Sequence, residues 1–322
     1  MRRRERAGGG VKERETVVIG TRGSALALAQ ANLVCRALRE AVPGLRLVLK
    51  AIRTTGDRLT EASLKRIAGK GVFTKEIETA LMAGRIDLAV HSLKDLPTSL
   101  PRGLRLGAVL RREDPRDVYI GRDARPLARL PAGAVIGTSS PRRVAQLRAR
   151  HPHLRTKELR GNLGTRLAKL GAAGSPYAGI VVAQAGLSRL GLRPRHARPF
   201  PTSEMVSAPG QGAIGIEIRE GDSRVAALVA RIHHARSAAE VAAERALLAL
   251  LGGGCALPIA ARGEALAGGR LRLTGLIASP DGRRIVRARA MGRLSGPEPL
   301  AARVHAALLA RGGRAVLRLA LR

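Results

Sequence analysis

Thr16-Val17-Val18-Ile19-Gly20-Thr21-Arg22-Gly23-Ser24 opens the part of the chain that decides the fold. Residues 17–20 read as a short buried strand, and the residues after Ser24 follow a helical pattern as far as Glu40. Residues 45–52 alternate between apolar and polar side chains as a second strand does. A strand, a helix and a strand in this order predict an α/β unit in which the strands run mostly parallel.

The alternation continues along the chain. Residues 74–83 predict a helix that Gly84 ends, and residues 86–90 predict a buried strand, with His91-Ser92-Leu93-Lys94-Asp95-Leu96-Pro97 as the loop at its carboxyl end. The pattern then restarts, with strands expected at 134–137, 156–159 and 179–183 and helices expected after the first two. We therefore predict two α/β units of similar size, divided near residues 113–116 and again near 199–209.

The last part of the chain has a different pattern. A helix is expected at 238–251, followed by the glycine-rich loop 252–258. Hairpin strands are expected at 271–278 and 284–290, before a final helix at 299–312. The expected fold class is α/β, with two doubly wound lobes flanking a cleft and a smaller C-terminal α+β domain.

Composition limits the class of protein. The chain has 322 residues, enough for two or three domains, and 45% of them are hydrophobic, so a core can be buried. The formal net charge of +34 predicts anionic partners, whether nucleic acid, an anionic membrane surface or a polycarboxylate substrate. No apolar run approaches the ~18–20 residues that span a bilayer. Residues 1–15 are basic and lack a following apolar segment, so we interpret them as a disordered leader rather than a signal peptide.

Cysteine and histidine usage argues against a disulfide framework or a metal site. The two cysteines, Cys35 and Cys255, suit a reducing cytosol. The seven histidines do not fall at ligand spacing, and the adjacent pair His233-His234 is interpreted as structural. Cys35 lies within a helical pattern and is expected to be a small buried hydrophobe.

Three turns from a strand to a helix place hydroxyl or amide groups beside arginine. Helix starts offer free N–H groups, and arginine forks bind carboxylates or phosphates. In any one turn alone, the serine is better explained as a helix cap and the arginine as a solvated side chain. Three such turns at strand ends favour a cleft lined for a polyanion. The turns carry Arg22 and Ser24; Ser139, Ser140, Arg142 and Arg143; and Arg160, Asn162 and Arg166.

Two further residues have open interpretations. Asp95 follows a buried strand, where it is either an ion-pairing or loop-capping carboxylate or a group that stabilises a cationic intermediate. Cys255 follows Gly252-Gly253-Gly254, where it is either a small buried residue or a reactive or modified thiol. No histidine stands near Cys255 in the sequence, so a protease-like pair is unsupported.

These segments together resemble the porphobilinogen deaminase family, also called hydroxymethylbilane synthase. The resemblance runs from about Val17 to the C-terminal helix, and the blocks Val90-His91-Ser92-Leu93-Lys94-Asp95 and Gly253-Gly254-Cys255 are its most specific parts. The other matching blocks are Ile19-Gly20-Thr21-Arg22 with Ser24, Gly69-Lys70-Gly71-Val72-Phe73-Thr74-Lys75-Glu76, Gly137-Thr138-Ser139-Ser140 with Arg142-Arg143, and Leu159-Arg160-Gly161-Asn162 with Thr165-Arg166.

The resemblance implies an activity, a cofactor and a fold. The family joins four porphobilinogen molecules head to tail, releases ammonia at each step, and ends with the linear tetrapyrrole hydroxymethylbilane, a precursor of haem, chlorophyll and corrins. It builds this chain on a dipyrromethane cofactor held by a thioether to a loop cysteine, which by motif is Cys255. The implied lobes are of the periplasmic-binding-protein type. The implied domains are 16–112 with 211–232, 113–210, and 233–322, after the leader 1–15.

The resemblance also implies roles for individual residues. Asp95 corresponds to the catalytic aspartate, which offsets positive charge when ammonia leaves the substrate and an azafulvene forms. Cofactor contacts are implied for Cys255, Lys94, Thr138, Ser139, Ser140, Arg142, Arg143, Asn162, Ala183 and Gln211. Substrate contacts are implied for Arg22, Ser24, Ser92, Arg160, Arg166 and Arg189. No metal is expected.

Two other functions fit part of the sequence. A basic nucleic-acid-binding protein would explain the charge, but only 1% of residues are aromatic and no helix-turn-helix or zinc pattern is present. A non-catalytic two-lobed anion-binding protein would explain the cleft, but it leaves Asp95 and Cys255 without a role. We therefore expect a cytoplasmic transferase, monomeric by family resemblance, with no nucleic acid or membrane partner.

Overall fold

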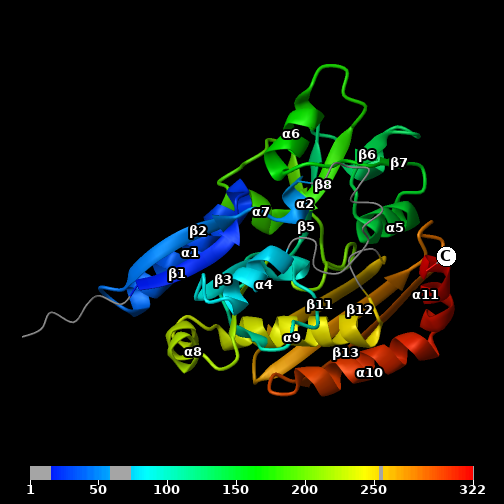
Figure 1. Cartoon of the computed structure of the whole chain (residues 1–322). Helices are drawn as coiled ribbons and strands as arrows, with labels where there is room; N and C mark the ends of the chain where they lie inside the picture. The colour runs from blue at the N-terminus through cyan, green and yellow to red at the C-terminus, as the bar shows by residue number, and fades with distance from the viewer. Residues whose placement is uncertain (1–15, 59–73, 254–256, 322) are drawn as a thin grey trace, which may run out of the picture.

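The computed structural model describes residues 16–58, 74–253 and 257–321. Three parts of the sequence interpretation lie outside these ranges, namely the leader 1–15, the block Gly69–Phe73 and Cys255. The described chain forms three groups of elements in Figure 1: a blue to cyan group joined by the yellow-green α8, a green group, and a yellow to red group. We call them the first, second and third lobes, each defined by its sheet.

The first lobe is built on a five-stranded sheet in the order β2-β1-β3-β10-β4. Its strands are β1 Thr16–Arg22, β2 Arg46–Ile52, β3 Leu88–Ser92, β4 Leu104–Val109 and β10 Ile214–Arg219. Its helices are α1 Ala25–Ala41, α2 Thr55–Arg58, α4 Lys75–Met82, the 3-10 turn η1 Leu93–Asp95 and α8 Ser223–Ala230. Ile19 of β1 and Leu38 of α1 are fully buried in its core, beside the buried Cys35. The expectation that Cys35 is a small buried residue is confirmed.

The second lobe repeats this plan, with a sheet in the order β7-β6-β8-β5-β9. Its strands are β5 Asp117–Gly121, β6 Val135–Gly137, β7 Arg155–Lys157, β8 Gly179–Ala183 and β9 Ala197–Pro199. Its helices are η2 Leu127–Arg129, α5 Pro141–Arg150, α6 Leu163–Gly171 and α7 Gln184–Arg189. The predicted order of strands and helices is confirmed, although β7 begins and ends earlier than the expected 156–159.

Each sheet is less parallel than the sequence pattern predicted. β1 pairs in parallel with β2 and β3, but β10 is antiparallel to β3 and β4. Likewise β6 pairs in parallel with β7 and β8, but β5 is antiparallel to β8 and β9. The reversed strands β5 and β10 are those that enter their sheets directly from the segments joining the first two lobes. Their direction is therefore set by the crossing between lobes.

Pairing with β10 also lengthens β3. His91 and Ser92 were expected in a loop, but they pair with Gly215 and Ile214 and belong to the strand. A partner strand that lies more than a hundred residues away is not visible in the local pattern. The next three residues then form the turn η1, which carries Lys94 and Asp95.

The third lobe is a three-stranded antiparallel sheet covered by helices, which confirms the expected α+β domain. Its strands are β11 Ile259–Leu266, β12 Arg270–Ala278 and β13 Ile285–Arg293, and its helices are α9 Ala235–Leu250, α10 Pro297–Ala310 and α11 Gly313–Leu321. β11 and α11 were not expected. Small apolar clusters join this lobe to both others: Val241 packs with Leu93 and Leu96, and Ala260 packs with Ala145.

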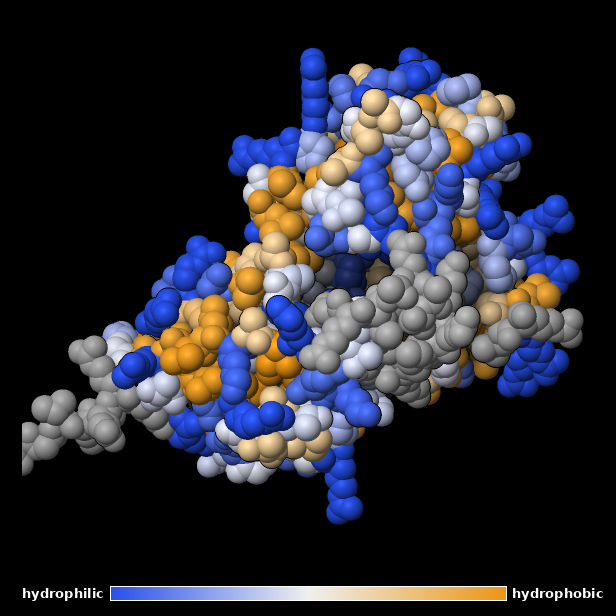
Figure 2. Space-filling model, turned by 45° about the horizontal axis from the view of Figure 1, so that its top comes forward, coloured by the Kyte–Doolittle hydropathy of each residue, from blue (hydrophilic) through white to orange (hydrophobic). Residues whose placement is uncertain are grey.

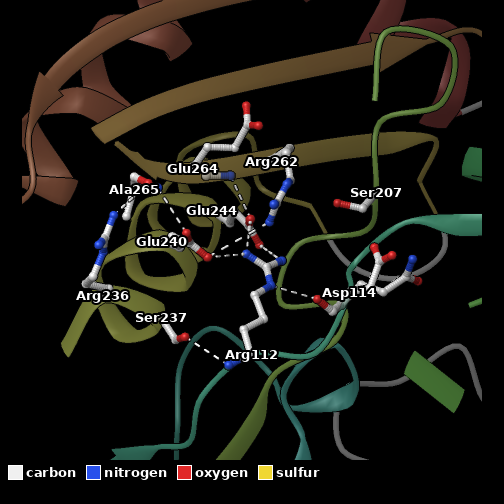
Figure 3. A network of polar contacts seen from close by, with 12 residues as sticks. Arg112, Asp114, Ser207, Arg236, Ser237, Glu240, Glu244, Arg262, Glu264 and Ala265 are labelled. Carbon is white, nitrogen blue, oxygen red and sulfur yellow. Dashed lines mark hydrogen bonds and ion pairs between the residues drawn. The ribbon is translucent and has the colours of Figure 1, made fainter. Parts of the chain in front are cut away.

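A buried ion-pair network fastens the third lobe to both segments that connect the first two (Figure 3). Glu244 of α9 is fully buried and accepts hydrogen bonds from both terminal nitrogens of Arg112, at 2.7 and 2.9 Å. Arg112 lies in the segment between β4 and β5. The same carboxylate accepts from the backbone N–H of Gly210, in the returning segment, and of Gly263 in β11, each at 2.7 Å. One side chain therefore links three parts of the chain.

Candidate active site

Asp95 lies beside a small pocket at the carboxyl end of β3. The pocket holds about 70 Å³, and Arg22, Ser24, His91 and Ser92 line it together with Asp95. Asp95 is exposed and makes no hydrogen bond or ion pair with any residue the structure describes. On the face shown in Figure 2 the molecule is hollowed at its centre, and hydrophilic residues lie in this hollow. The carboxylate of Asp95 is therefore free to contact a bound molecule.

Arg166 of the second lobe lies close enough to Asp95 for their charges to interact. Arg166 belongs to α6, and its Nε donates to the carbonyl of Gly161 at 2.8 Å. Burial lowers the pKa of Arg166, and the negative charge of Asp95 acts in the opposite direction. Charged residues from two different lobes thus interact across the site, as expected if the strand ends of the two lobes face each other.

Lys94 faces the second lobe as well. Burial lowers the pKa of Lys94, the charge of Asp95 opposes this, and the charges of Arg143 and Arg142 add to it. An ammonium group with a depressed pKa, next to two guanidinium groups, gains stability when an anion binds beside it.

Arg142 and Arg143 are buried around a carboxylate that sequence reasoning missed, Asp117. The shortest distances from its oxygens are 2.6 Å to Arg142 Nη1 and 2.7 Å to Arg143 Nη2, and Gln211 Nε2 donates to it at 3.0 Å. Burial alone would raise the pKa of Asp117, but the charges of the two arginines outweigh it and hold the pKa well below 3.8. The alternative that these arginines are merely solvated is wrong, because they are only 4% and 6% exposed. A lone Asp at the start of the apolar run Val118-Tyr119-Ile120 was the available signal.

The three candidate helix caps divide into two kinds. Ser24 accepts from the N–H of Ala27 at 3.3 Å, and Asn162 accepts from the N–H of Thr165 at 2.8 Å, so both act as caps. Ser140 occupies the cap position before Pro141, as expected, but its side chain makes no capping hydrogen bond. The prediction that Ser140 caps the helix is thus correct for its position and wrong for its hydroxyl, which does not bond to the helix N–H groups.

Other candidate residues have structural partners in the described chain. Ser139 donates to the carbonyl of Leu159 at 2.8 Å, and the hydroxyl of Thr138 accepts from the N–H of Ser140 at 3.3 Å. Arg189 donates to the carbonyl of Gly212 at 2.7 Å; burial lowers its pKa to about 10, although Glu113 acts against this. The remaining contacts are Ser92 with Gln30 at 2.9 Å and Arg160 with Glu158, while Ala183 precedes α7.

Arg245 of α9 holds the turn that carries Asp95, and the sequence contained no signal for it. Its guanidinium donates to the carbonyls of Leu96 and Pro97, at 2.9 and 2.6 Å. The third lobe therefore fixes the backbone just after the exposed carboxylate. His233 and His234 are structural, as predicted: His233 Nδ1 accepts from the N–H of Val109 at 3.3 Å, and His234 caps α9 by accepting from the N–H of Ser237 at 3.2 Å.

Within the described ranges, no group of three or more His, Cys, Asp or Glu side chains is arranged to hold a metal ion. The helices there include none that is both long and apolar enough to cross a membrane.

Comparison with known proteins finds two family models and several sequence relatives that carry the same family name. Residues 17–227 match the family model for the porphobilinogen deaminase dipyromethane cofactor binding domain, and residues 238–310 match that for the porphobilinogen deaminase C-terminal domain. The chain is 48% identical to a porphobilinogen deaminase of Thermus thermophilus over 301 residues, covering 94% of this chain and 98% of the relative. It is 47% identical to that of Thiobacillus denitrificans over 302 residues, covering the same shares. A solved periplasmic binding protein from Brucella ovis is 16% identical, covers 69% of this chain and 67% of its own, and has a TM-score of 0.40.

Proposed function

The chain belongs to the porphobilinogen deaminase family, and from that premise we propose how its residues divide the work of the reaction. The enzyme is a transferase that condenses four porphobilinogen molecules head to tail, with loss of ammonia at each step, and releases hydroxymethylbilane for tetrapyrrole synthesis. The observation that carries the assignment of the site is the exposed carboxylate of Asp95. It lines a pocket together with Arg22, and its negative charge acts on the guanidinium of Arg166.

The residues around the cleft fit a dipyrromethane cofactor. Each pyrrole of the cofactor and substrate carries an acetate and a propionate. Lys94, Arg142 and Arg143 together carry more positive charge than the neighbouring Asp117 and Asp95 offset. The buried Nε of Arg142 makes no hydrogen bond among the described residues. This surplus of donors and positive charge suits carboxylates. When bound, the cofactor supplies the free pyrrole α-carbon to which the first substrate is joined.

We assign Asp95 the central catalytic role. Its carboxylate accepts hydrogen bonds from pyrrole N–H groups and offsets the positive charge that develops as the substrate loses ammonia. Asp95→Glu keeps the charge but moves it by one methylene, so kcat should fall while the fold is retained. Asp95→Ala should reduce kcat further. Steady-state ammonia release measures both, and normal turnover by the alanine variant would refute this role.

The surrounding donors bind and orient carboxylates. Lys94, Thr138, Ser139, Ser140, Arg142, Arg143, Asn162, Ala183 and Gln211 are proposed to contact the cofactor. Arg22, Ser24, Ser92, Arg160, Arg166 and Arg189 are proposed to contact the substrate and growing chain. Because Arg142 and Arg143 already bind Asp117, that carboxylate orients their remaining donors toward the ligand. Gln211 donates through Nε2 to Asp117 and to the carbonyl of Pro115, so its side-chain oxygen is left as an acceptor.

We propose Cys255 as the covalent anchor. Intact mass under denaturing conditions should show an adduct equal to two porphobilinogens less two ammonias, and Cys255→Ser should lack it. An adduct that persists in Cys255→Ser would place the anchor elsewhere. If the parent is purified without the adduct, adding porphobilinogen should generate it.

The remaining proposals concern the molecule as a whole. We propose that it acts in the cytoplasm as a monomer, without nucleic-acid partners, and that its domains are 16–112 with 211–232, 113–210 and 233–322. Size-exclusion chromatography with light scattering tests the monomer, and DNA titration at several salt concentrations tests the absence of nucleic-acid binding.

A further inference from the structure

Two buried ionisable side chains beside the Asp95 pocket have no role in the chemistry above. His91 Nε2 lies 3.0 Å from Glu217 Oε2, and the two side chains are 5% and 0% exposed. Burying two ionisable groups costs free energy even when they pair, so their presence next to the reacting centre calls for a reason. His91 also lines the pocket together with Asp95 and Arg22.

The sheet register brings these two side chains together. β3 and β10 are antiparallel, with His91 opposite Gly215 and Glu217 opposite Ala89. His91 and Glu217 are thus diagonal neighbours, and because alternate residues share a face, both point to the same side of the sheet. Asp95 follows His91 by four residues, one turn beyond the end of the strand.

The contact with Glu217 determines which nitrogen of His91 is free. A carboxylate accepts hydrogen bonds, so Nε2 carries the proton and donates it. In the neutral ring Nδ1 then holds a lone pair. No hydrogen bond to Nδ1 is found among the described residues, and His91 is one of the residues that line the pocket. His91 therefore combines an unbonded acceptor nitrogen with a place in the lining of the pocket beside Asp95.

Charged groups from several elements surround the His91 ring. Glu217 on β10 provides a fully buried carboxylate. Burial raises the pKa of Glu78 on α4 and the charge of Glu217 adds to this, while a hydrogen bond with Thr74 and the charge of His91 act in the opposite direction. The other charged groups nearby are Asp95 on η1, Arg22 on β1 and Arg245 on α9, whose pKa responds to the charge of Glu217.

Each condensation needs a proton acceptor. The substrate enters as an ammonium and loses ammonia, the C–N electron pair leaving with it. The α-carbon of the terminal pyrrole then forms the new C–C bond, and its C–H bond must break so that the electron pair returns to the ring. The released proton must go to a base, and proton and ammonia finally leave as ammonium.

We propose that Nδ1 of His91 is the base that accepts this α-proton, with Glu217 holding the ring and stabilising its imidazolium. This rests on the proposed role of the Asp95 pocket. Asp95 keeps its task of holding the pyrrole N–H groups, so the two residues divide charge stabilisation and proton removal between them. A positioned general base typically contributes about 10²–10⁴-fold to rate.

The test compares His91→Gln with the parent holoenzyme, using porphobilinogen and porphobilinogen deuterated at its free α-carbon. Intact mass first establishes equal cofactor loading, and His305→Gln, on α10 of the third lobe, is the matched control. We expect kcat to fall about 10²-fold in His91→Gln, with a larger primary isotope effect than the parent shows. An unchanged kcat overturns the proposal, as does a reduced kcat with an unchanged isotope effect, which would mark His91 as structural.

A second variant keeps the proposal falsifiable if His91→Gln does not load its cofactor. Glu217→Gln retains the ring but removes the charge that favours the imidazolium. The acidic limb of the pH profile of kcat should move to lower pH, and a limb that does not move overturns the proposal. Product formation by the parent, followed in the same assay, tests the overall function independently.

Discussion

Replacing Glu244 by glutamine should loosen the junction of the three lobes. The carboxylate accepts four hydrogen bonds, from two nitrogens of Arg112 and from the N–H groups of Gly210 and Gly263. Glu244→Gln removes the charge and converts one acceptor oxygen into a donor. The Arg112 side chain, 4% exposed, then keeps the Gln211 carbonyl, at 2.9 Å, and the more distant carboxylate of Glu240, at 3.4 Å. A buried charge would be left without its bidentate partner.

The expected loss of stability follows from that imbalance. Removing one member of a buried ion pair costs about 3–5 kcal/mol, because the other charge remains desolvated. At about 2 °C per kcal/mol, the lower end of the range for large domains, the melting temperature should fall by roughly 6–10 °C. Differential scanning calorimetry of the variant and the parent measures this shift.

A matched control separates burial from the loss of any glutamate. Glu264 pairs with Arg272 at 2.9 Å, and these side chains are 24% and 33% exposed. An exposed pair contributes roughly 0–1 kcal/mol, so Glu264→Gln should change the melting temperature by no more than about 2 °C. Equal shifts in the two variants would refute the reasoning, because burial of Glu244 would then have no special weight.

Three further predictions concern the cleft. Because the pKa of Asp117 is depressed in the folded chain, its ionised carboxylate stabilises the fold above about pH 3.8, and this contribution is lost as the pH falls below that value. Asp117→Asn should therefore weaken the fall in unfolding free energy at acidic pH, as measured by urea unfolding at a series of pH values. An equally steep fall in the variant contradicts this. Arg245→Met removes the donors to Leu96 and Pro97, so kcat should fall about 10- to 100-fold with unchanged circular dichroism, and Arg245→Lys should recover part of it. Arg166→Gln should raise KM about tenfold by removing a carboxylate-binding charge, whereas a loss in kcat alone would argue against a binding role.

Local sequence patterns predicted most of the secondary structure and the location of Asp95. The helix from Ala25 and the strand at Gly179–Ala183 follow from periodicity and from flanking glycine or polar residues. Asp95 stands out because a polar residue after a buried strand lies at the carboxyl edge of a sheet. The same rule led to Arg22 and Arg166 at their strand ends.

Residues that act through distant partners escaped that reasoning. Asp117, Glu217 and Glu244 find their partners far along the chain, so the residues beside them in the sequence do not show what they bind. Each is buried in the folded chain against a basic side chain from another element: Arg142, His91 and Arg112 respectively. The direction of β10 was also hidden, because the pairing of a strand is decided by where the chain returns.

The sequence by itself determined the succession of strands and helices, the excess of basic residues and, through the resemblance of its motifs, the family. These properties are local, since they depend on the spacing of side chains along a few turns or one strand. Only the tertiary structure decided which basic residues interact with Asp95, which carboxylates are buried, and that His91 pairs with Glu217. Those properties depend on strand register and on burial, because a charge takes its pKa and its partners from whatever the fold places around it.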